Sequence, residues 1–255
     1  MKRVRVIPTL LLDGRKLVKT TQFKSATYVG DPINVLRIFN EKEVDEICVV
    51  DISVTKRKKP PDIDYIRLLA SECFMPLSYG GGITKVEQAK EIFQAGVEKI
   101  ILGTSAFYNP TLVNEISAMA GSQSVVVSID YKKNWFGQSR AYIRGGEKSA
   151  MVTPLVYAKQ MEALGAGEIL LQNIEREGTL KGYDLEVIRE VSGAVNIPVV
   201  ASGGASSIND FVKAIQVGAS AVAAGYMFIY KGPNRAVLIN YPGVQLLSDN
   251  LYNKL

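Results

Sequence analysis

Glycine-rich turns that follow short apolar runs are the most informative chemical feature of the sequence. One is the segment 79–82, Tyr-Gly-Gly-Gly, and another is 202–204, Ser-Gly-Gly; Gly103-Thr104 and Gly225-Tyr226 follow the next apolar run in each case. Glycine lets the backbone approach an anion closely, so that N–H groups can bind phosphate oxygens. The candidate phosphate-binding residues are Gly81, Gly82, Gly103, Thr104, Gly203, Gly204, Gly225 and Tyr226.

The glycine turns recur at equivalent places, which predicts two anion sites on one face and a ligand that carries two phosphates. The alternative is that the glycines only permit tight turns between a strand and a helix. A single Gly-Gly pair would favour that alternative. The recurrence in pairs of neighbouring runs favours phosphate binding.

Asp130 is the candidate proton-transfer residue, because it ends the apolar run 124–130 and the next residues do not begin a helix. The chain contains no histidine, which excludes Ser-His-Asp triads, Cys-His pairs and histidine-bound metals. Further candidates for substrate binding are Lys19, Asp51, Glu175, Glu177 and Thr179. Lys19 begins a long polar segment, 19–30, that we expect to act as a mobile lid. A solvated loop remains an alternative for 175–179.

Four charged residues stand at the starts of apolar runs, at the opposite end from the glycines. They are Arg5, Glu46, Lys99 and Glu168. In a closed barrel these side chains should converge on the bottom opening, where their charges cancel. Burying such a ring costs desolvation that apolar residues would avoid. Either it stabilises a solvent-facing bottom surface, or it forms a polar gate for a small neutral molecule.

Short β-branched runs alternate along the chain with amphipathic stretches. The predicted strands are 4–10, 46–52, 75–81, 99–105, 124–130, 168–174, 197–204 and 220–226. The predicted helices are 31–43, 62–72, 85–96, 109–121, 153–165, 184–194 and 207–218, from apolar residues spaced at i, i+3, i+4 and i+7. Strands that are apolar almost throughout indicate a parallel sheet covered by helices.

An internal repeat with an offset of 122 residues connects the two halves of the chain. It aligns Pro76 with Pro198, Glu46 with Glu168, Asp51 with Asn173, Gly81 with Gly203 and Gly103 with Gly225. Each half then holds four strand–helix units. We therefore predict one domain over residues 1–255, a (β/α)8 TIM barrel of two fused half-barrels. A doubly wound open sheet would leave edge strands unprotected.

Composition excludes several classes of protein. The chain has 255 residues, a net charge of +5 and two cysteines, which suggest neither a disulfide framework nor a zinc site. The basic residues are scattered apart from 56–59, so we expect no nucleic-acid partner. No apolar run is long enough for a membrane span. We expect a cytoplasmic protein without a metal or cofactor.

Several segments resemble the cyclase subunit of imidazole glycerol phosphate synthase, from histidine biosynthesis. They include RVIPTLLLDGR, VDEICVVDIS, GGGI, GSQSVVVSID and ASGGA, and the similarity extends from Arg5 to about Phe228. The resemblance implies a barrel that binds a glutaminase subunit on its N-terminal face and receives ammonia through the gate. It also implies that ammonia reacts at the other end with a bis-phosphorylated ribulosyl nucleotide. All four charged residues match the gate of that family.

The opposite end departs from the family pattern. The family uses two aspartates as acid and base; one matches Asp130, but the other is Leu11 here. Asp13, two residues on, is a weak substitute because it belongs to the next loop. The family's asparagine after strand 4 is Gly103, and its serine after strand 8 is Tyr226. Losing one member of an acid–base pair commonly costs about 10² to 10⁴-fold in rate.

The preferred hypothesis is a diverged relative that channels ammonia from a glutaminase to a biosynthetic step. Such paralogues are associated with surface-polysaccharide (O-antigen) synthesis, where a third protein amidinates a sugar. One alternative is the authentic histidine-pathway cyclase. Another is a catalytically silent conduit that activates its glutaminase and binds a phosphorylated regulator.

Overall fold

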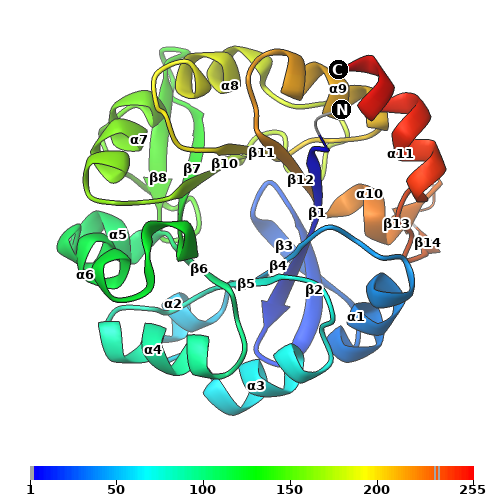
Figure 1. Ribbon diagram of the computed structural model, residues 1–255. Coiled ribbons are helices and arrows are strands. Elements are labelled where there is room, and N and C mark those ends of the chain that lie inside the picture. The colour runs from blue at the N-terminus through cyan, green and yellow to red at the C-terminus, as the bar shows by residue number, and fades with distance from the viewer. Residues whose placement is uncertain (1–2, 233, 235) are drawn as a thin grey trace.

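The eight predicted strands form a closed parallel barrel in the computed structural model, which describes residues 3–232, 234 and 236–255 (Figure 1). The barrel strands are β1 (Arg5–Asp13), β4 (Ile47–Asp51), β5 (Leu77–Gly80), β6 (Lys99–Leu102), β7 (Val125–Lys133), β10 (Glu168–Asn173), β11 (Val199–Ser202) and β12 (Ala221–Ala224). They pair in this order, and β12 pairs with β1. Closure leaves no unpaired barrel edge, which confirms the predicted TIM barrel.

The seven predicted helices lie outside the barrel, as Figure 1 shows. They are α1 (Pro32–Glu41), α3 (Ile63–Ser71), α4 (Val86–Gln94), α6 (Thr111–Ala120), α7 (Pro154–Ala163), α8 (Leu185–Ser192) and α9 (Ile208–Gln216). The side chains of Asp31 and Thr153 cap α1 and α7, and each is followed by proline. Proline suits the first helical turn because its missing N–H would have no intrahelical partner.

Short elements that the sequence patterns did not predict complete the chain. They are α2 (Val54–Arg57), α5 (Thr104–Tyr108), α10 (Tyr226–Ile229), α11 (Val244–Asn250), the 3-10 turns Ser122–Ser124 and Tyr252–Lys254, and the strand pair β13 (Tyr230–Lys231) and β14 (Ala236–Val237). The C-terminal segment packs against the first strand, because the Tyr241 hydroxyl donates to the Val6 carbonyl at 3.0 Å.

The strands are buried on both faces, as their composition predicts. Outward-facing side chains pack against the helices in one large core. A separate apolar cluster fills the lower part of the barrel interior and consists of Ile7, Cys48, Ile101, Val126, Leu170, Val200, Ala221 and Ala223. This inner cluster lies between the charged residues at the strand starts and the polar residues at the strand ends.

The internal repeat is visible in the backbone. Gly81 and Gly203, 122 residues apart, both have positive φ, at 129° and 92°. A Cβ atom on Gly81 would lie 2.6 Å from the Asp51 carbonyl oxygen, and one on Gly203 would lie 2.5 Å from that of Asn173. Asp51 and Asn173 are also 122 residues apart. Only glycine fits at either position, so the same strand-to-helix turn occurs twice.

The segment that follows β1 differs from the expected mobile lid. Residues 19–30 contribute to an antiparallel pair, β2 (Lys16–Thr21) and β3 (Lys24–Gly30), and β2 continues the sheet from β1. Leu17 and Val18 are buried and anchor β2. The polar composition of this segment suggested a loop. The structure forms a hairpin instead, because β2 pairs with both β1 and β3.

A second antiparallel extension follows β7. β7 pairs with β8 (Ser139–Ile143), which pairs with β9 (Lys148–Ser149). The turn between β7 and β8 exposes Trp135 and Phe136. Thus β1 and β7 both continue past the barrel as antiparallel ribbons, at the end where the glycine turns lie.

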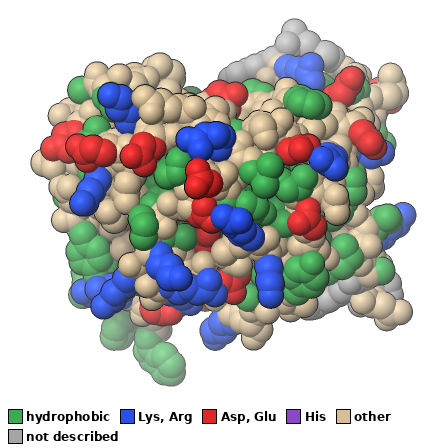
Figure 2. Space-filling model, turned by 90° about the horizontal axis from the view of Figure 1, so that it is seen from below, with side chains coloured by type: hydrophobic (Ala, Val, Ile, Leu, Met, Phe, Trp, Pro, Cys, Tyr) green, Lys and Arg blue, Asp and Glu red, His purple; other side chains and the backbone are tan. Residues whose placement is uncertain are grey.

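Basic, acidic and hydrophobic side chains are interspersed on the side of the molecule that Figure 2 shows, with some hydrophobic side chains projecting from one edge. Among the described residues, no helix combines the length and apolar character that crossing a membrane requires.

Candidate functional site

A cavity of about 400 Å³ opens at the C-terminal ends of the barrel strands. Its walls include Thr9 and Leu11 from β1, Asp51 from β4, and Ser128 and Asp130 from β7. These residues reach it because alternate side chains of a barrel strand face inward. The cavity therefore collects most of the predicted chemistry in one place, as expected for this fold.

Asp130 is half-buried in this cavity, and its Oδ1 accepts a hydrogen bond from the Ser128 hydroxyl at 3.0 Å. Removal from bulk water raises the pKa of Asp130 to about 6, and the hydrogen bond from Ser128 opposes the rise only partly. A carboxyl group with that pKa exchanges protons readily near neutral pH. Asp130 therefore suits general acid or base chemistry.

The raised pKa predicts a pH-dependent stability. In the folded chain Asp130 binds its proton between about pH 4 and 6, where an unfolded aspartate has lost it. Its contribution is therefore greatest below pH 4 and is lost as the pH rises through 6. Relative to Asp130→Asn, the wild type should lose about 2 kcal/mol of unfolding free energy between pH 4 and 7. Urea unfolding at several pH values measures this, with the exposed Asp64→Asn as control. Parallel stability curves for wild type and Asp130→Asn would contradict it.

Lys19 is a buried lysine that lines the same cavity as Asp130, with 3% of its surface exposed. Its ammonium group donates to the Thr9 carbonyl at 2.8 Å. Burial lowers the pKa of Lys19, and the nearby Glu177 carboxylate partly offsets this. A lysine with a lowered pKa can act in proton transfer or bind an anionic ligand.

Glu177 and Asp51 are the buried carboxylates of the wall. Gln172 donates from Nε2 to Glu177 Oε2 at 2.9 Å. Asp51 Oδ1 accepts hydrogen bonds from Ser53 N and Oγ at 2.9 and 2.8 Å. Burial raises the pKa of Asp51, against these bonds. Gln172 was not predicted from the sequence; it faces the cavity because it lies two residues after Leu170 on the same strand.

Two predicted substrate-binding residues lie outside the cavity wall. Glu175 is exposed and accepts from the Lys133 N–H at 2.9 Å, which ties the loop after β10 to the β7 extension. Thr179 donates its hydroxyl hydrogen to the Arg176 carbonyl at 2.7 Å. Both residues shape the loop that places Glu177 in the cavity.

Leu11 faces the cavity from the middle of β1, where its neighbours across the sheet are Val18 and Val50. The nearest acidic residue on the same strand, Asp13, forms an ion pair with Arg57. Its side chain is not part of the cavity wall among the described residues. Asp13 is thus poorly placed to replace the missing carboxylate.

The glycine turns of the two halves differ in accessibility. Gly81, Gly82, Gly103 and Thr104 are half-buried and line the cavity. In the other half Gly203, Gly204, Gly225 and Tyr226 are all buried, and of these only Gly225 belongs to the described cavity wall. The Tyr226 ring lies 4.7 Å from the ring of Tyr230, centroid to centroid.

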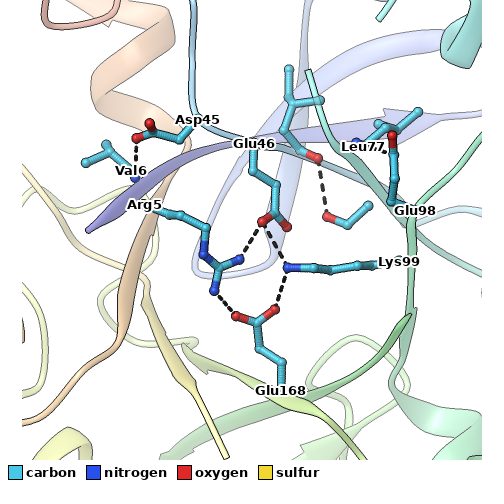
Figure 3. Close-up of polar contacts among 10 residues, drawn as sticks. Arg5, Val6, Asp45, Glu46, Leu77, Glu98, Lys99 and Glu168 are labelled. Carbon is cyan, nitrogen blue, oxygen red and sulfur yellow. Dashed lines mark hydrogen bonds and ion pairs between the residues drawn. The ribbon is translucent and has the colours of Figure 1, made fainter. Parts of the chain in front are cut away.

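The four predicted gate residues form a closed ring at the opposite end of the barrel. Figure 3 shows the side chains of Arg5, Glu46, Lys99 and Glu168 pointing toward one another. Arg5 forms ion pairs with both glutamates. Lys99 Nζ lies 3.0 Å from Glu46 Oε2 and 2.9 Å from Glu168 Oε2. Each charge is therefore paired with two opposite charges.

The ring is partly removed from water. Each glutamate residue is 4% exposed, whereas 31% of the Arg5 side chain and 20% of the Lys99 side chain remain exposed. Burial would lower the pKa of Arg5, but hydrogen bonds and charges from Glu168 and Glu46 outweigh it and raise the pKa. The side chains converge at the centre of the barrel floor, and Arg5 and Lys99 still face solvent there.

A short apolar layer separates the ring from the cavity. Ile101 lies two residues after Lys99, and Leu170 lies two residues after Glu168; both belong to the inner apolar cluster and both line the cavity. Two residues of a parallel strand span about 6.6 Å. The ring and the cavity therefore share one axis and lie one side-chain layer apart.

The fold and the site together define a class of protein. It is an eight-stranded parallel barrel with an acid-lined cavity at one end and a buried charged ring at the other. Residues 5–233 match the family of the histidine biosynthesis protein. The chain is 46% identical over 248 residues to the provisionally named imidazole glycerol phosphate synthase subunit hisF2 of Pseudomonas aeruginosa, covering 97% of this chain and 99% of that protein.

Other relatives agree. The provisionally named imidazole glycerol phosphate synthase subunit HisF of Leptospira borgpetersenii is 48% identical over 246 residues, covering 95% of this chain and 96% of that protein. The subunit HisF of Alkaliphilus metalliredigens is 38% identical over 227 residues, covering 89% and 90%. The chain belongs to the HisF-like cyclase subunits of the histidine biosynthesis family.

Proposed function

We propose that the chain binds a glutaminase on its N-terminal face and conducts ammonia from it through the barrel to the upper cavity. The observation that supports this most directly is the ring of Arg5, Glu46, Lys99 and Glu168 on the barrel axis. A ring of buried ion pairs gives no clear gain in stability over apolar residues. Its position in the floor, directly beneath a cavity, suits a gate.

The layer above the ring favours ammonia over ammonium. The inner cluster there is apolar, with small side chains at Ala221 and Ala223. A neutral NH₃ molecule crosses such a layer at little cost, whereas an ammonium ion would lose its hydration. Because the ring is closed by four ion pairs, it must open when ammonia passes, and binding of the glutaminase is the proposed trigger.

For the acceptor of the ammonia, we propose a sugar that a third protein amidinates in surface-polysaccharide synthesis. Leu11 supports this over cyclisation, because an aliphatic side chain in the cavity cannot exchange a proton with substrate. The cyclase reaction of histidine biosynthesis is the alternative, and the relatives named HisF at 38% identity favour it. A conduit without any chemistry of its own is the remaining possibility.

The test is reconstitution with the glutaminase subunits encoded in the same genome. A stable 1:1 complex should form, and glutamine hydrolysis should rise at least about tenfold when the barrel is added, since the barrel would complete the glutaminase site. Ammonia should then emerge at the cavity end. The variant Trp135→Ala, on the opposite end from the gate, serves as the matched control. Absence of both complex and stimulation would refute the ammonia conduit.

A further inference from the structure

The turn between β7 and β8 presents two aromatic side chains to solvent. Trp135 is 97% exposed and Phe136 is 84% exposed. Large aromatic side chains are normally covered at least in part, because removing them from water is favourable. At these exposures neither side chain contributes packing to the fold. We call this pair, Trp135 and Phe136, the aromatic tip.

Hydrogen bonds fix the backbone that carries the aromatic tip. Asn134 Oδ1 accepts from the N–H groups of Phe136 and Gln138 at 3.0 and 2.9 Å, and the Gly137 N–H donates to the Asn134 carbonyl at 3.0 Å. Gly137 has a φ of 75°, which glycine adopts without strain. Asparagine and glycine thus define the first and last positions of the turn, whereas its two central positions accept most residue types. The backbone therefore does not require aromatic residues at 135 and 136.

Basic side chains surround the aromatic tip. The ribbon 131–149 contains five basic residues and one acidic residue, a net charge of +4 in a chain whose net charge is +5. The basic residues are Lys132, Lys133, Arg140, Arg144 and Lys148, and those at 133, 144 and 148 are exposed. A surface of this composition attracts anions and anionic surfaces.

The neighbouring loop after β4 extends the positive charge. Residues 56–59, Lys-Arg-Lys-Lys, are all exposed. Lys56 Nζ lies 3.2 Å from Glu147 Oε1, so this run lies against the ribbon and offsets the one acidic residue of the ribbon. On the other side, Glu175 in the loop after β10 accepts from the Lys133 N–H at 2.9 Å. The rim around the aromatic tip therefore carries charges of both signs, with positive charge in excess.

The aromatic tip lies at the end of the barrel where the cavity opens. Asp130 of β7 lines the cavity, and the same strand then continues to the tip. Figure 2 shows hydrophobic side chains that project from the lower edge of the molecule beside a group of lysine and arginine side chains. The charged ring lies at the opposite end of the barrel. A surface that binds the tip therefore faces the cavity mouth and leaves the N-terminal face accessible.

The size of the aromatic tip favours a lipid surface over a folded protein. Aromatic side chains bury about 150–250 Å² each, whereas a stable protein–protein interface buries about 800 Å² on each partner. Tryptophan is enriched at the interface between a bilayer and water, and phenylalanine and tryptophan are common on the apolar faces of interfacial segments. Lysine and arginine side chains bind anionic headgroups. The tip and the basic rim together match an anionic bilayer.

We propose that the chain docks on the surface of an anionic phospholipid bilayer through Trp135 and Phe136, while the basic residues of the ribbon and of 56–59 bind the headgroups. The two aromatic side chains enter the headgroup region, and the cavity mouth then faces the bilayer. Docking of this kind brings the cavity close to ligands that are anchored in a membrane. It does not require the glutaminase.

The chain reports on its own docking, because Trp135 is its only tryptophan. The full chain is titrated with vesicles of phosphatidylglycerol and phosphatidylcholine in equal parts, and with vesicles of phosphatidylcholine alone. With the anionic vesicles, Trp135 emission should move to shorter wavelength and the chain should sediment with the lipid. High salt should release it, because salt screens the basic residues. Absence of both the spectral shift and sedimentation, or tighter binding to a duplex oligonucleotide than to the vesicles, would overturn the proposal.

Two phenylalanine variants separate the aromatic tip from exposed aromatic residues in general. Phe136→Ser should weaken binding to the anionic vesicles about tenfold, because it removes much of the inserted apolar surface and retains Trp135 as the reporter. Phe74→Ser is the matched control, since Phe74 is 85% exposed in the connection between α3 and β5, at the opposite end of the barrel. Equal binding by the two variants would refute the assignment to the tip.

Two lysine variants test the electrostatic part of docking. Lys133→Gln should weaken binding to the anionic vesicles about fivefold, as expected for one basic residue near such a bilayer. Lys90→Gln, on the exposed face of α4, is the matched control. If the two lysine variants bind alike, the basic rim does not bind headgroups and the proposal fails. Because no glutaminase is present in these experiments, failure here leaves the ammonia conduit to its own test.

Discussion

Replacing Lys99 by methionine is expected to destabilise the chain by about 2–4 kcal/mol, more than any neutral change on an outer helix. Lys99 bonds both Glu46 and Glu168, at 3.0 and 2.9 Å. Without it, two buried carboxylates share Arg5 alone and repel each other. The exposed part of Lys99 keeps the effect below that of a fully buried pair. Urea unfolding at neutral pH measures the loss.

A second substitution that restores the charge balance of the ring should recover part of the lost stability. Lys99→Met combined with Glu168→Gln removes one charge of each sign and leaves Arg5 paired with Glu46, so the double variant should regain at least half of the lost stability. Lys90→Met, on the exposed face of α4, is the control for the loss of a lysine. If Lys99→Met costs no more than Lys90→Met, the ring is not an energetically coupled unit.

The same variants separate stability from conduction. In a reconstituted complex, the charge-balanced double variant should fold while its ring has lost the gate pattern. Part of the ammonia should then be lost before it reaches the cavity end. The amount of ammonia delivered should fall below the amount of glutamine hydrolysed. Tight coupling in the folded double variant would argue that the ring is only structural.

Much of the architecture could be predicted because its signals are local. The apolar run 168–174 and the helical spacing in 207–218 each depend on neighbouring residues, and β10 and α9 form there. The charged ring could be predicted because Glu46 and Glu168 stand at strand starts, and a closed parallel barrel brings all strand starts together. The barrel topology is therefore sufficient to bring these side chains into one ring.

The accessibility of the second glycine turn could not be predicted in this way. Gly203 and Gly204 follow the same local pattern as Gly81 and Gly82, yet Gly203 and Gly204 are buried whereas Gly81 and Gly82 are half-buried. Lys19 is brought to the cavity by the β2 ribbon, which its polar composition had suggested was a lid. Arg144 was missed for a similar reason, since only the returning β8–β9 turn places it over the cavity.

Leu11→Asp is expected to produce the largest gain of activity. The substitution places a carboxylate in the wall of the cavity that Lys19 and the raised-pKa carboxyl of Asp130 also line. Purified wild type with ammonium salts should convert the bis-phosphorylated histidine-pathway intermediate very slowly. Restoring the missing acid–base partner should raise kcat by about 10² to 10⁴-fold. Product formation from that intermediate, followed by chromatography, measures the gain.

Leu11→Asn is the matched control, because it has the same shape as aspartate but cannot exchange a proton at neutral pH. Equal rates for the aspartate and asparagine variants would show that proton transfer at position 11 is not what limits the reaction, and rapid turnover by the wild type would show that the chain is a working cyclase despite Leu11.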